Sequence, residues 1–69
     1  MSISPEISTL PEWVIWLAQD ANGDWWGYSV EPHESHNGWY ENEVGRHIHL
    51  GRMARPADWR QTLQRVRQD

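Results

Sequence analysis

Cysteine, lysine and phenylalanine are all absent from this 69-residue sequence. Of these three absences, the absence of cysteine excludes the largest number of structural features. It rules out disulfides and thiolate metal sites, which usually support small secreted domains. A chain of this length forms one domain at most, and its single core supplies only about 3–5 kcal/mol of stability. We therefore expect a reducing, cytoplasmic environment and a further source of stability.

Long hydrophobic stretches are also missing. The longest apolar run, Trp13–Ala18, is far shorter than the roughly 20 residues that span a bilayer. Residues 1–10 lack the basic and apolar regions of a signal peptide. The sequence predicts a soluble chain with no membrane partner. Its first 11 residues are polar and contain two prolines, so we expect an extended arm over residues 1–11 and one domain over residues 12–69.

Basic residues are missing from residues 1–44, which carry eight acidic side chains. Residues 45–69 carry six arginines and two aspartates, so the two parts have charges of −8 and +4. Arginine suits paired contacts with carboxylates or phosphates. Either the two parts neutralise each other within the fold, or the arginines contact a partner. The net charge of −4 makes a nucleic acid an unfavourable partner, although the acidic half could mimic DNA.

A β-hairpin is predicted around the dipeptide Asn22-Gly23. Apolar residues alternate over Glu12–Asp20 and over Asp24–Val30, and Asn-Gly between two such segments is typical of a two-residue type I′ turn. That loop would pair Leu17 with Tyr28. One face of the hairpin, the predicted core, then holds Trp13, Ile15, Leu17, Trp26, Tyr28 and Val30.

The opposite face of that hairpin would hold Val14, Trp16, Ala18, Trp25, Gly27 and Ser29. This face is half apolar, which is unusual for a surface in water. We therefore expect Val14, Trp16 and Trp25 to form an interface, either with a second copy in a homodimer or with another protein.

The remaining segments predict an α+β fold. Residues 31–38 are typical of a loop, and strand character resumes at Trp39-Tyr40 and Arg46–Leu50, as one bent strand or two. In the second stretch Ile48 and Leu50 share one side, and His47 and His49 share the other. We expect a three-stranded, or four-stranded, antiparallel sheet.

A C-terminal α-helix is predicted to pack on one face of this sheet. Trp59, Leu63 and Val66 follow helical spacing, with Asp58 and Gln61 as a capping pair. The order of elements would then be β-β-β-α.

Two sets of side chains are candidate ligand sites. Arg52, Arg55 and Arg60 lie around the predicted helix start, where backbone N–H groups could help to bind an anion. His33, His36, His47 and His49 are an alternative set of zinc ligands, although nothing in their spacing fixes a convergence. The sequence offers no catalytic nucleophile motif, so we expect a protein that is not an enzyme and has no cofactor.

The segments WLAQDANGDWWGYSVEP and DWRQTL carry a family resemblance. They resemble a group of very small bacteriophage proteins with a Trp-containing strand, an Ala-x-Asp-x-x-Gly turn, an aromatic second strand and a short Asp-Trp helix. The resemblance covers about two thirds of the chain. It implies a phage or prophage origin and a location in the host cytoplasm.

Two functions follow as hypotheses. The first is a non-enzymatic accessory protein that binds and modulates a host protein. The second is a protein that sequesters a nucleotide, with tryptophan rings stacked on the base and arginines on the phosphates.

Overall fold

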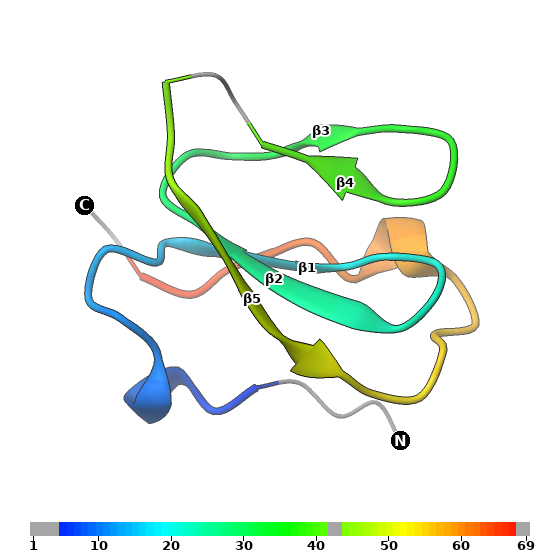
Figure 1. The fold of residues 1–69 in the computed structure, drawn as a ribbon, viewed down its shortest axis with the longest axis horizontal. Helices are drawn as coiled ribbons and strands as arrows, with labels where there is room; N and C mark the ends of the chain where they lie inside the picture. Colours follow the sequence, from blue (N-terminus) through cyan, green and yellow to red (C-terminus); the bar gives the residue numbers. More distant parts are fainter. Residues whose placement is uncertain (1–4, 42–43, 68–69) are drawn as a thin grey trace.

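The computed structural model describes residues 5–41 and 44–67 and is built from short antiparallel strands (Figure 1). Four strands form the main sheet in the order β5-β2-β1-β6, and two form a separate hairpin, β3–β4. The strands are β1 (Trp16–Gln19), β2 (Asp24–Tyr28), β3 (His33–Glu34), β4 (Trp39–Tyr40), β5 (His47–Arg52) and β6 (Gln64–Arg65). Two 3-10 turns, η1 (Ile7–Thr9) and η2 (Trp59–Gln61), complete the described elements.

The β1–β2 hairpin is confirmed, but its predicted loop is wrong. The Gly23 N–H donates to the Asp20 carbonyl at 2.9 Å, and the Asp20 N–H donates to the Asp24 carbonyl at 2.9 Å. The loop therefore has three residues, and Gly23 occupies the left-handed position at φ 101°. A type I′ turn would also require a positive φ at Asn22, which Asn22 does not have. The pairing shifts by one residue, so the β2 residues change face relative to those of β1: Trp25, not Trp26, shares the core face with Leu17.

The core lies on the face that carries Leu17 and Trp25. Leu17 pairs with Gly27, and a side chain at Gly27 would meet Val14, since its Cβ would be 2.9 Å from Val14 Cγ1. Leu10 joins them from the segment before β1, so part of the predicted arm is packed on the sheet. The partly buried residues around this cluster are Trp13, Ile48, Leu50, Met53 and Val66.

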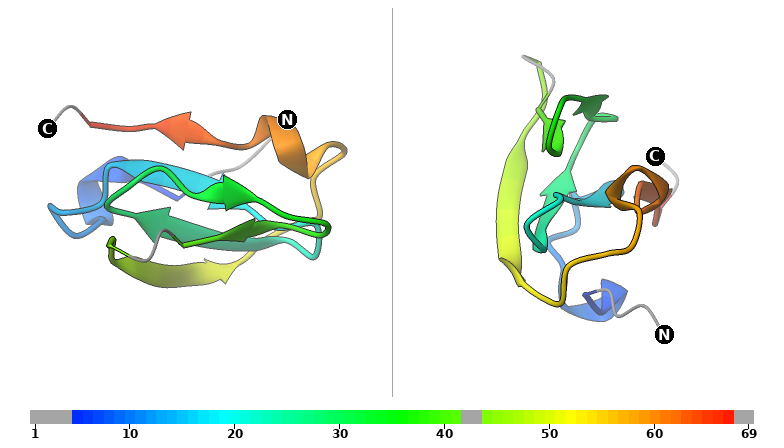
Figure 2. Two further views of the ribbon diagram at one scale, coloured as in Figure 1. Left: turned by 90° about the horizontal axis from the view of Figure 1, so that it is seen from above. Right: turned by 90° about the vertical axis from the view of Figure 1, so that its right-hand side faces the viewer.

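The β3–β4 hairpin lies on the other side of β1 and β2, opposite η1 (Figure 2). It is attached to the β1–β2 turn by polar contacts. The Trp39 N–H donates to Asp20 Oδ1 at 2.9 Å, and the Ala21 N–H donates to the Asn37 carbonyl at 3.0 Å. On this side Ala18 and Tyr28 are buried, so both faces of β1 and β2 are covered in part.

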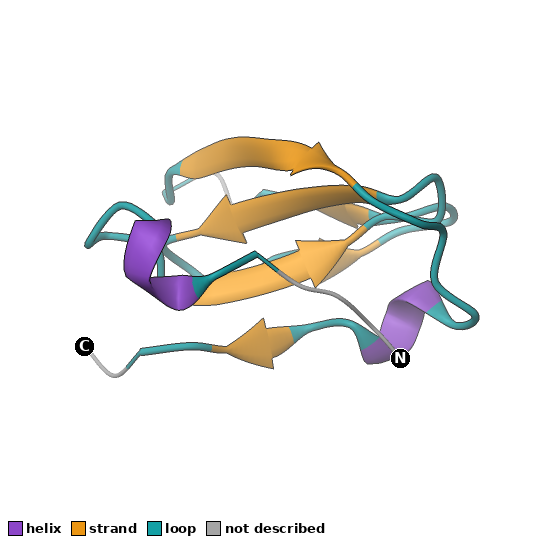
Figure 3. Ribbon diagram, turned by 90° about the horizontal axis from the view of Figure 1, so that it is seen from below, coloured by secondary structure: helices purple, strands orange, loops and turns teal. Residues whose placement is uncertain are grey.

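The predicted C-terminal α-helix is wrong. Residues 59–61 form the single 3-10 turn η2, and residues 64–65 form β6, which pairs with β1 at the edge of the sheet (Figure 3). The Thr62 hydroxyl donates to the Gln19 carbonyl at 3.1 Å and accepts from the Gln19 N–H at 2.9 Å. The segment is extended because it forms hydrogen bonds with the backbone N–H and C=O groups at the otherwise unpaired edge of β1. Only the capping role of Asp58 is confirmed, since its side chain accepts from the Arg60 N–H at 3.1 Å.

Residues 39–50 form two strands, which resolves the alternative left open by the sequence. β4 belongs to the small hairpin and β5 to the edge of the main sheet. The alternation in β5 is as predicted: Ile48 packs against the core, and His47 contacts Trp26 on the opposite face. Among the described residues, no helix has the length and apolar character needed to cross a membrane.

Candidate functional site

An open cleft of about 640 Å³ lies beside the β3–β4 hairpin. It is formed by the segment that leads from β2 into β3, by β4, and by residues of and after η2. This volume falls within the range of about 300–1,000 Å³ that is usual for ligand sites. The residues that line it are Val30, Glu31, Pro32, His33, Glu34, Trp39, Arg60 and Leu63.

Trp39 is the aromatic wall of the cleft and is fixed at both its backbone and its ring. Its N–H donates to Asp20 Oδ1 at 2.9 Å, and its ring Nε1 donates to the Gln19 carbonyl at 3.1 Å. The ring meets Trp59 edge to face, with centroids 5.7 Å apart and an interplanar angle of 87°. These contacts hold the ring in one orientation before any ligand arrives, which limits the entropy lost on binding.

Arg60 connects the two sides of the cleft. Its guanidinium lies 4.4 Å from the centroid of the Trp59 ring, and its Nε donates to Glu34 Oε2 at 3.2 Å. Trp59 is buried and does not line the cleft. The two partners of the ion pair are 50% and 52% exposed, so solvent screens the pair and a ligand can reach it.

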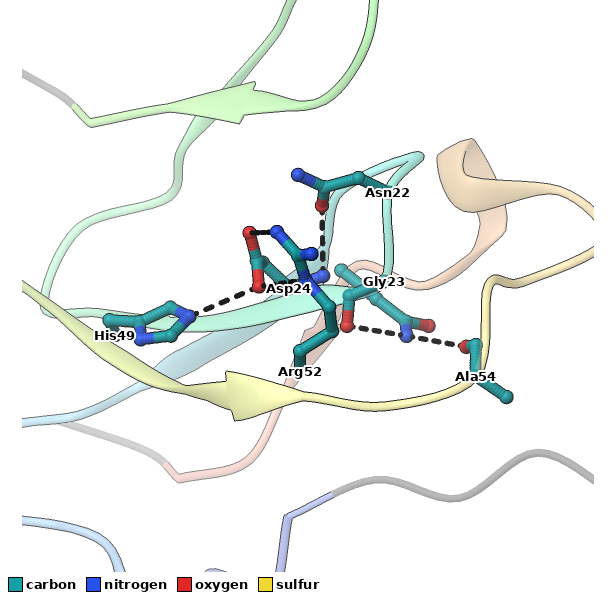
Figure 4. Close-up of polar contacts among 7 residues, drawn as sticks. Asn22, Gly23, Asp24, His49, Arg52 and Ala54 are labelled. Carbon is teal, nitrogen blue, oxygen red and sulfur yellow. Dashed lines mark hydrogen bonds and ion pairs between the residues drawn. The ribbon is translucent and has the colours of Figure 1, made fainter.

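The predicted anion site of Arg52, Arg55 and Arg60 is not supported by these contacts. Arg52 donates twice to the Asp24 carboxylate, at 3.0 and 3.1 Å (Figure 4), whereas Arg60 pairs with Glu34 on a different strand. Arg55 is exposed. The Asp58 carboxylate already occupies the start of η2, where an anion was expected.

The other arginines are also used within the fold. Arg46 lies 4.3 Å from the Trp13 ring centroid, and Arg65 lies 5.6 Å from that of Trp16. Arg67 donates to four backbone carbonyls, those of Ile7, Leu10, Pro11 and Val14. These three arginines therefore pack the C-terminal part of the chain against the N-terminal part, whereas Arg52 and Arg60 pair with carboxylates of the acidic part.

The carboxyl group of Asp24 has a strongly lowered pKa. Hydrogen bonds from Arg52 and His49 hold the pKa of its carboxyl well below its usual range. The hydrogen bond to Asp24 and its negative charge in turn raise the pKa of Arg52. This contact joins β2 to the edge strand β5 on the face opposite the core.

The four histidines do not form a common site in the described residues. The rings of His47 and His49 lie 5.7 and 4.9 Å from that of Trp26, and His49 Nε2 is 3.2 Å from Asp24 Oδ1. His33 packs against Tyr40, and His36 is exposed in the β3–β4 loop. Across residues 5–41 and 44–67, no three histidine or acidic side chains are placed to hold a metal ion.

The predicted interface of Val14, Trp16 and Trp25 does not form a surface. Val14 and Trp25 are 0% and 3% exposed and belong to the core. Trp16 lies on the other face with Arg65 near its ring. The homodimer was predicted in order to cover Trp16 and Trp25 together, and the observed register removes that reason.

Sequence reasoning missed most of the cleft. It identified Arg60 and His33 as candidates, but not Glu31, Glu34, Trp39 or Leu63. The cleft depends on how residues 30–34 meet residues 60–63, and these were expected to be a loop and a helix. The nearest signal in the sequence is the acidic, proline-containing stretch before Trp39.

Comparison with protein-family models, curated proteins and solved structures gives no match to this chain. The resemblance to small bacteriophage proteins therefore stays a prediction.

Proposed function

We propose that this protein is a non-enzymatic binding protein that docks a short segment of a partner protein in the cleft beside β3–β4. The observation that carries the proposal is the cleft: an open site with a fixed tryptophan wall. An open site of this kind suits a segment of polypeptide, which stays partly in solvent, better than an enclosed small molecule.

The composition of the cleft supports a protein partner. Its apolar residues are Val30, Pro32, Trp39 and Leu63, and its charged residues are Glu31, Glu34 and Arg60. Protein interfaces commonly combine an apolar centre with a polar rim, and tryptophan is frequent among the residues that dominate binding. The fixed Trp39 ring would bury apolar area without a large loss of side-chain freedom.

Binding is favoured over catalysis by the kinds of side chain present. The eight residues that line the cleft include no serine, threonine, cysteine or lysine, and their one imidazole, His33, packs against Tyr40. The arginine contacts also favour a protein partner over a nucleotide, because Arg52 and Arg60 each already pair with a carboxylate. The bacteriophage resemblance suggests that the partner is a host protein, whose activity the bound chain would modulate.

The test is selection of peptides from a random display library on the purified protein. Two variants with the same chemical change then locate the binding site: Leu63→Gln inside the cleft and Ile7→Gln on the exposed turn η1. We expect selected peptides to bind wild type and Ile7→Gln equally and to bind Leu63→Gln roughly tenfold more weakly. Circular dichroism shows whether both variants are folded.

Two results would contradict the proposal. Peptides that bind all three proteins equally would place the binding site outside the cleft. A library that yields no binder to the folded wild type would remove the peptide-docking function.

A further inference from the structure

An example of the chemistry that the cleft can bind lies at its border. The Arg60 guanidinium stacks on Trp59, with 4.4 Å from its carbon to the ring centroid, and donates to Glu34 at 3.2 Å. A cation between an aromatic face and a carboxylate is favourable on both counts. Trp39 and Glu31 offer the same two kinds of group in the same cleft, without a cation between them in the described structure.

The charges around the cleft also favour a cation. Arg60 is the one arginine or lysine among its lining residues, and it is paired with Glu34. Glu31 is exposed and makes no ion pair within the described residues. An incoming positive charge therefore meets an excess of carboxylates.

We infer that the cleft accepts a cationic side chain, arginine or lysine, from the partner segment, placed against Trp39 and within reach of Glu31 and Glu34. This inference rests on the proposed function and names the chemistry of its partner. It also assigns a role to Arg60: its side chain occupies part of the acidic cleft and competes with the incoming cation for Glu34.

The test uses three synthetic peptides, acetyl-Ala-Leu-X-Leu-Ala-amide, in which X is arginine, citrulline or glutamate. Citrulline has nearly the shape of arginine without its charge. Binding is followed by NMR titration, with the Trp39 indole N–H and the Leu63 amide as reporters of the cleft. We expect the arginine peptide to shift both signals and the citrulline peptide to bind roughly fivefold more weakly.

Three variants then separate the carboxylates from the arginine. Glu31→Gln should lower the affinity for the arginine peptide roughly threefold to fivefold. Glu12→Gln makes the same change on an exposed residue outside the cleft and should leave that affinity unchanged. Arg60→Gln should retain or tighten binding, because it frees Glu34 for the incoming cation. A site for anions predicts the opposite, since Arg60 would then be required.

Equal or tighter binding of the citrulline or glutamate peptide would overturn the inference but leave the cleft as a docking site. Loss of arginine-peptide binding in folded Arg60→Gln would also overturn it. If none of the three peptides shifts the cleft signals and the display library gives no binder, the proposed function fails together with the inference.

Discussion

The two sides of the β1–β2 hairpin are held by different forces. On one side Val14, Leu17 and Trp25 are almost fully buried and pack through apolar contacts. On the other, Ala18 and Tyr28 are buried as well, but the β3–β4 hairpin itself is attached through hydrogen bonds to residues 19–21. Apolar burial supplies most of the stability of a small domain, whereas a hydrogen bond adds only about 1 kcal/mol. The first side therefore sets whether the chain folds, and the second sets where the cleft wall stands.

The largest effect is expected from the core side. Leu17 is 1% exposed, and Leu17→Ala should lose roughly 2–5 kcal/mol, most of the stability of a domain of this size. Urea denaturation followed by tryptophan fluorescence measures the loss. Ile7→Ala, at a side chain with 47% of its surface exposed, is the control and should stay within about 0.5 kcal/mol of wild type. A stable Leu17→Ala protein would mean that the two sides contribute alike.

The second largest effect is expected at the turn between β1 and β2. Gly23 and Gly51 both have positive φ, 101° and 116°, but a Cβ at Gly23 would overlap the Met53 carbonyl oxygen, whereas one at Gly51 meets no atom within 4 Å. Gly51→Ala should cost about 1 kcal/mol of backbone strain, and Gly23→Ala about 2–3 kcal/mol or more. Thermal unfolding of both variants gives the comparison. Equal losses would show that the contact with Met53 relaxes without cost.

A smaller, local effect is expected on the hairpin side. Asp20→Ala removes the acceptor of the Trp39 N–H and should loosen the β3–β4 hairpin at a cost of about 1–2 kcal/mol. Amide hydrogen exchange should therefore become roughly tenfold faster at Trp39 while the amides of β2 stay protected. Uniformly faster exchange would mean that the hairpin does not open separately from the core.

The smallest effect concerns the ion pair at the edge strand. The folded pKa of Asp24 is lowered by Arg52 and His49, so its contribution to stability is complete above the ordinary carboxyl pKa and is lost as the pH falls through the folded value. Asp24→Asn should be less stable than wild type at pH 7, and the difference should shrink below about pH 4. Thermal melts across this range test the sign. If the stability difference between Asp24→Asn and wild type does not change with pH, the variant is destabilised by the change in side-chain shape and not by the loss of charge.

The sequence predicts the hairpin but not its register. Asn22-Gly23 marks a turn in either case, because both a two-residue loop and the observed three-residue loop place a glycine at positive φ. The two loops differ by one residue, and that residue decides whether Trp25 or Trp26 enters the core. No local pattern distinguished them, since both strands carry large apolar residues on both faces.

The C-terminal segment shows a second limit. Trp59, Leu63 and Val66 follow helical spacing, yet the segment extends along β1, where the Thr62 hydroxyl and the Val66 N–H find backbone partners at Gln19 and Ile15. The need of an edge strand for such partners is a property of the assembled sheet. The cleft depends on the same contact, so it could not be predicted before the path of this segment was known.

The contacts of Arg67 have a consequence for how the protein is made. The Arg67 guanidinium donates to backbone carbonyls within residues 7–14, and β6 is the outer neighbour of β1 in the sheet. During synthesis the segment around β1 must therefore wait until some fifty further residues have left the ribosome before its last partners arrive. Contacts between such distant residues slow folding. Until then the outer edge of β1 has no strand beside it, so the arrival of residues 62–67, and not the earlier hairpin, is the step that completes this sheet.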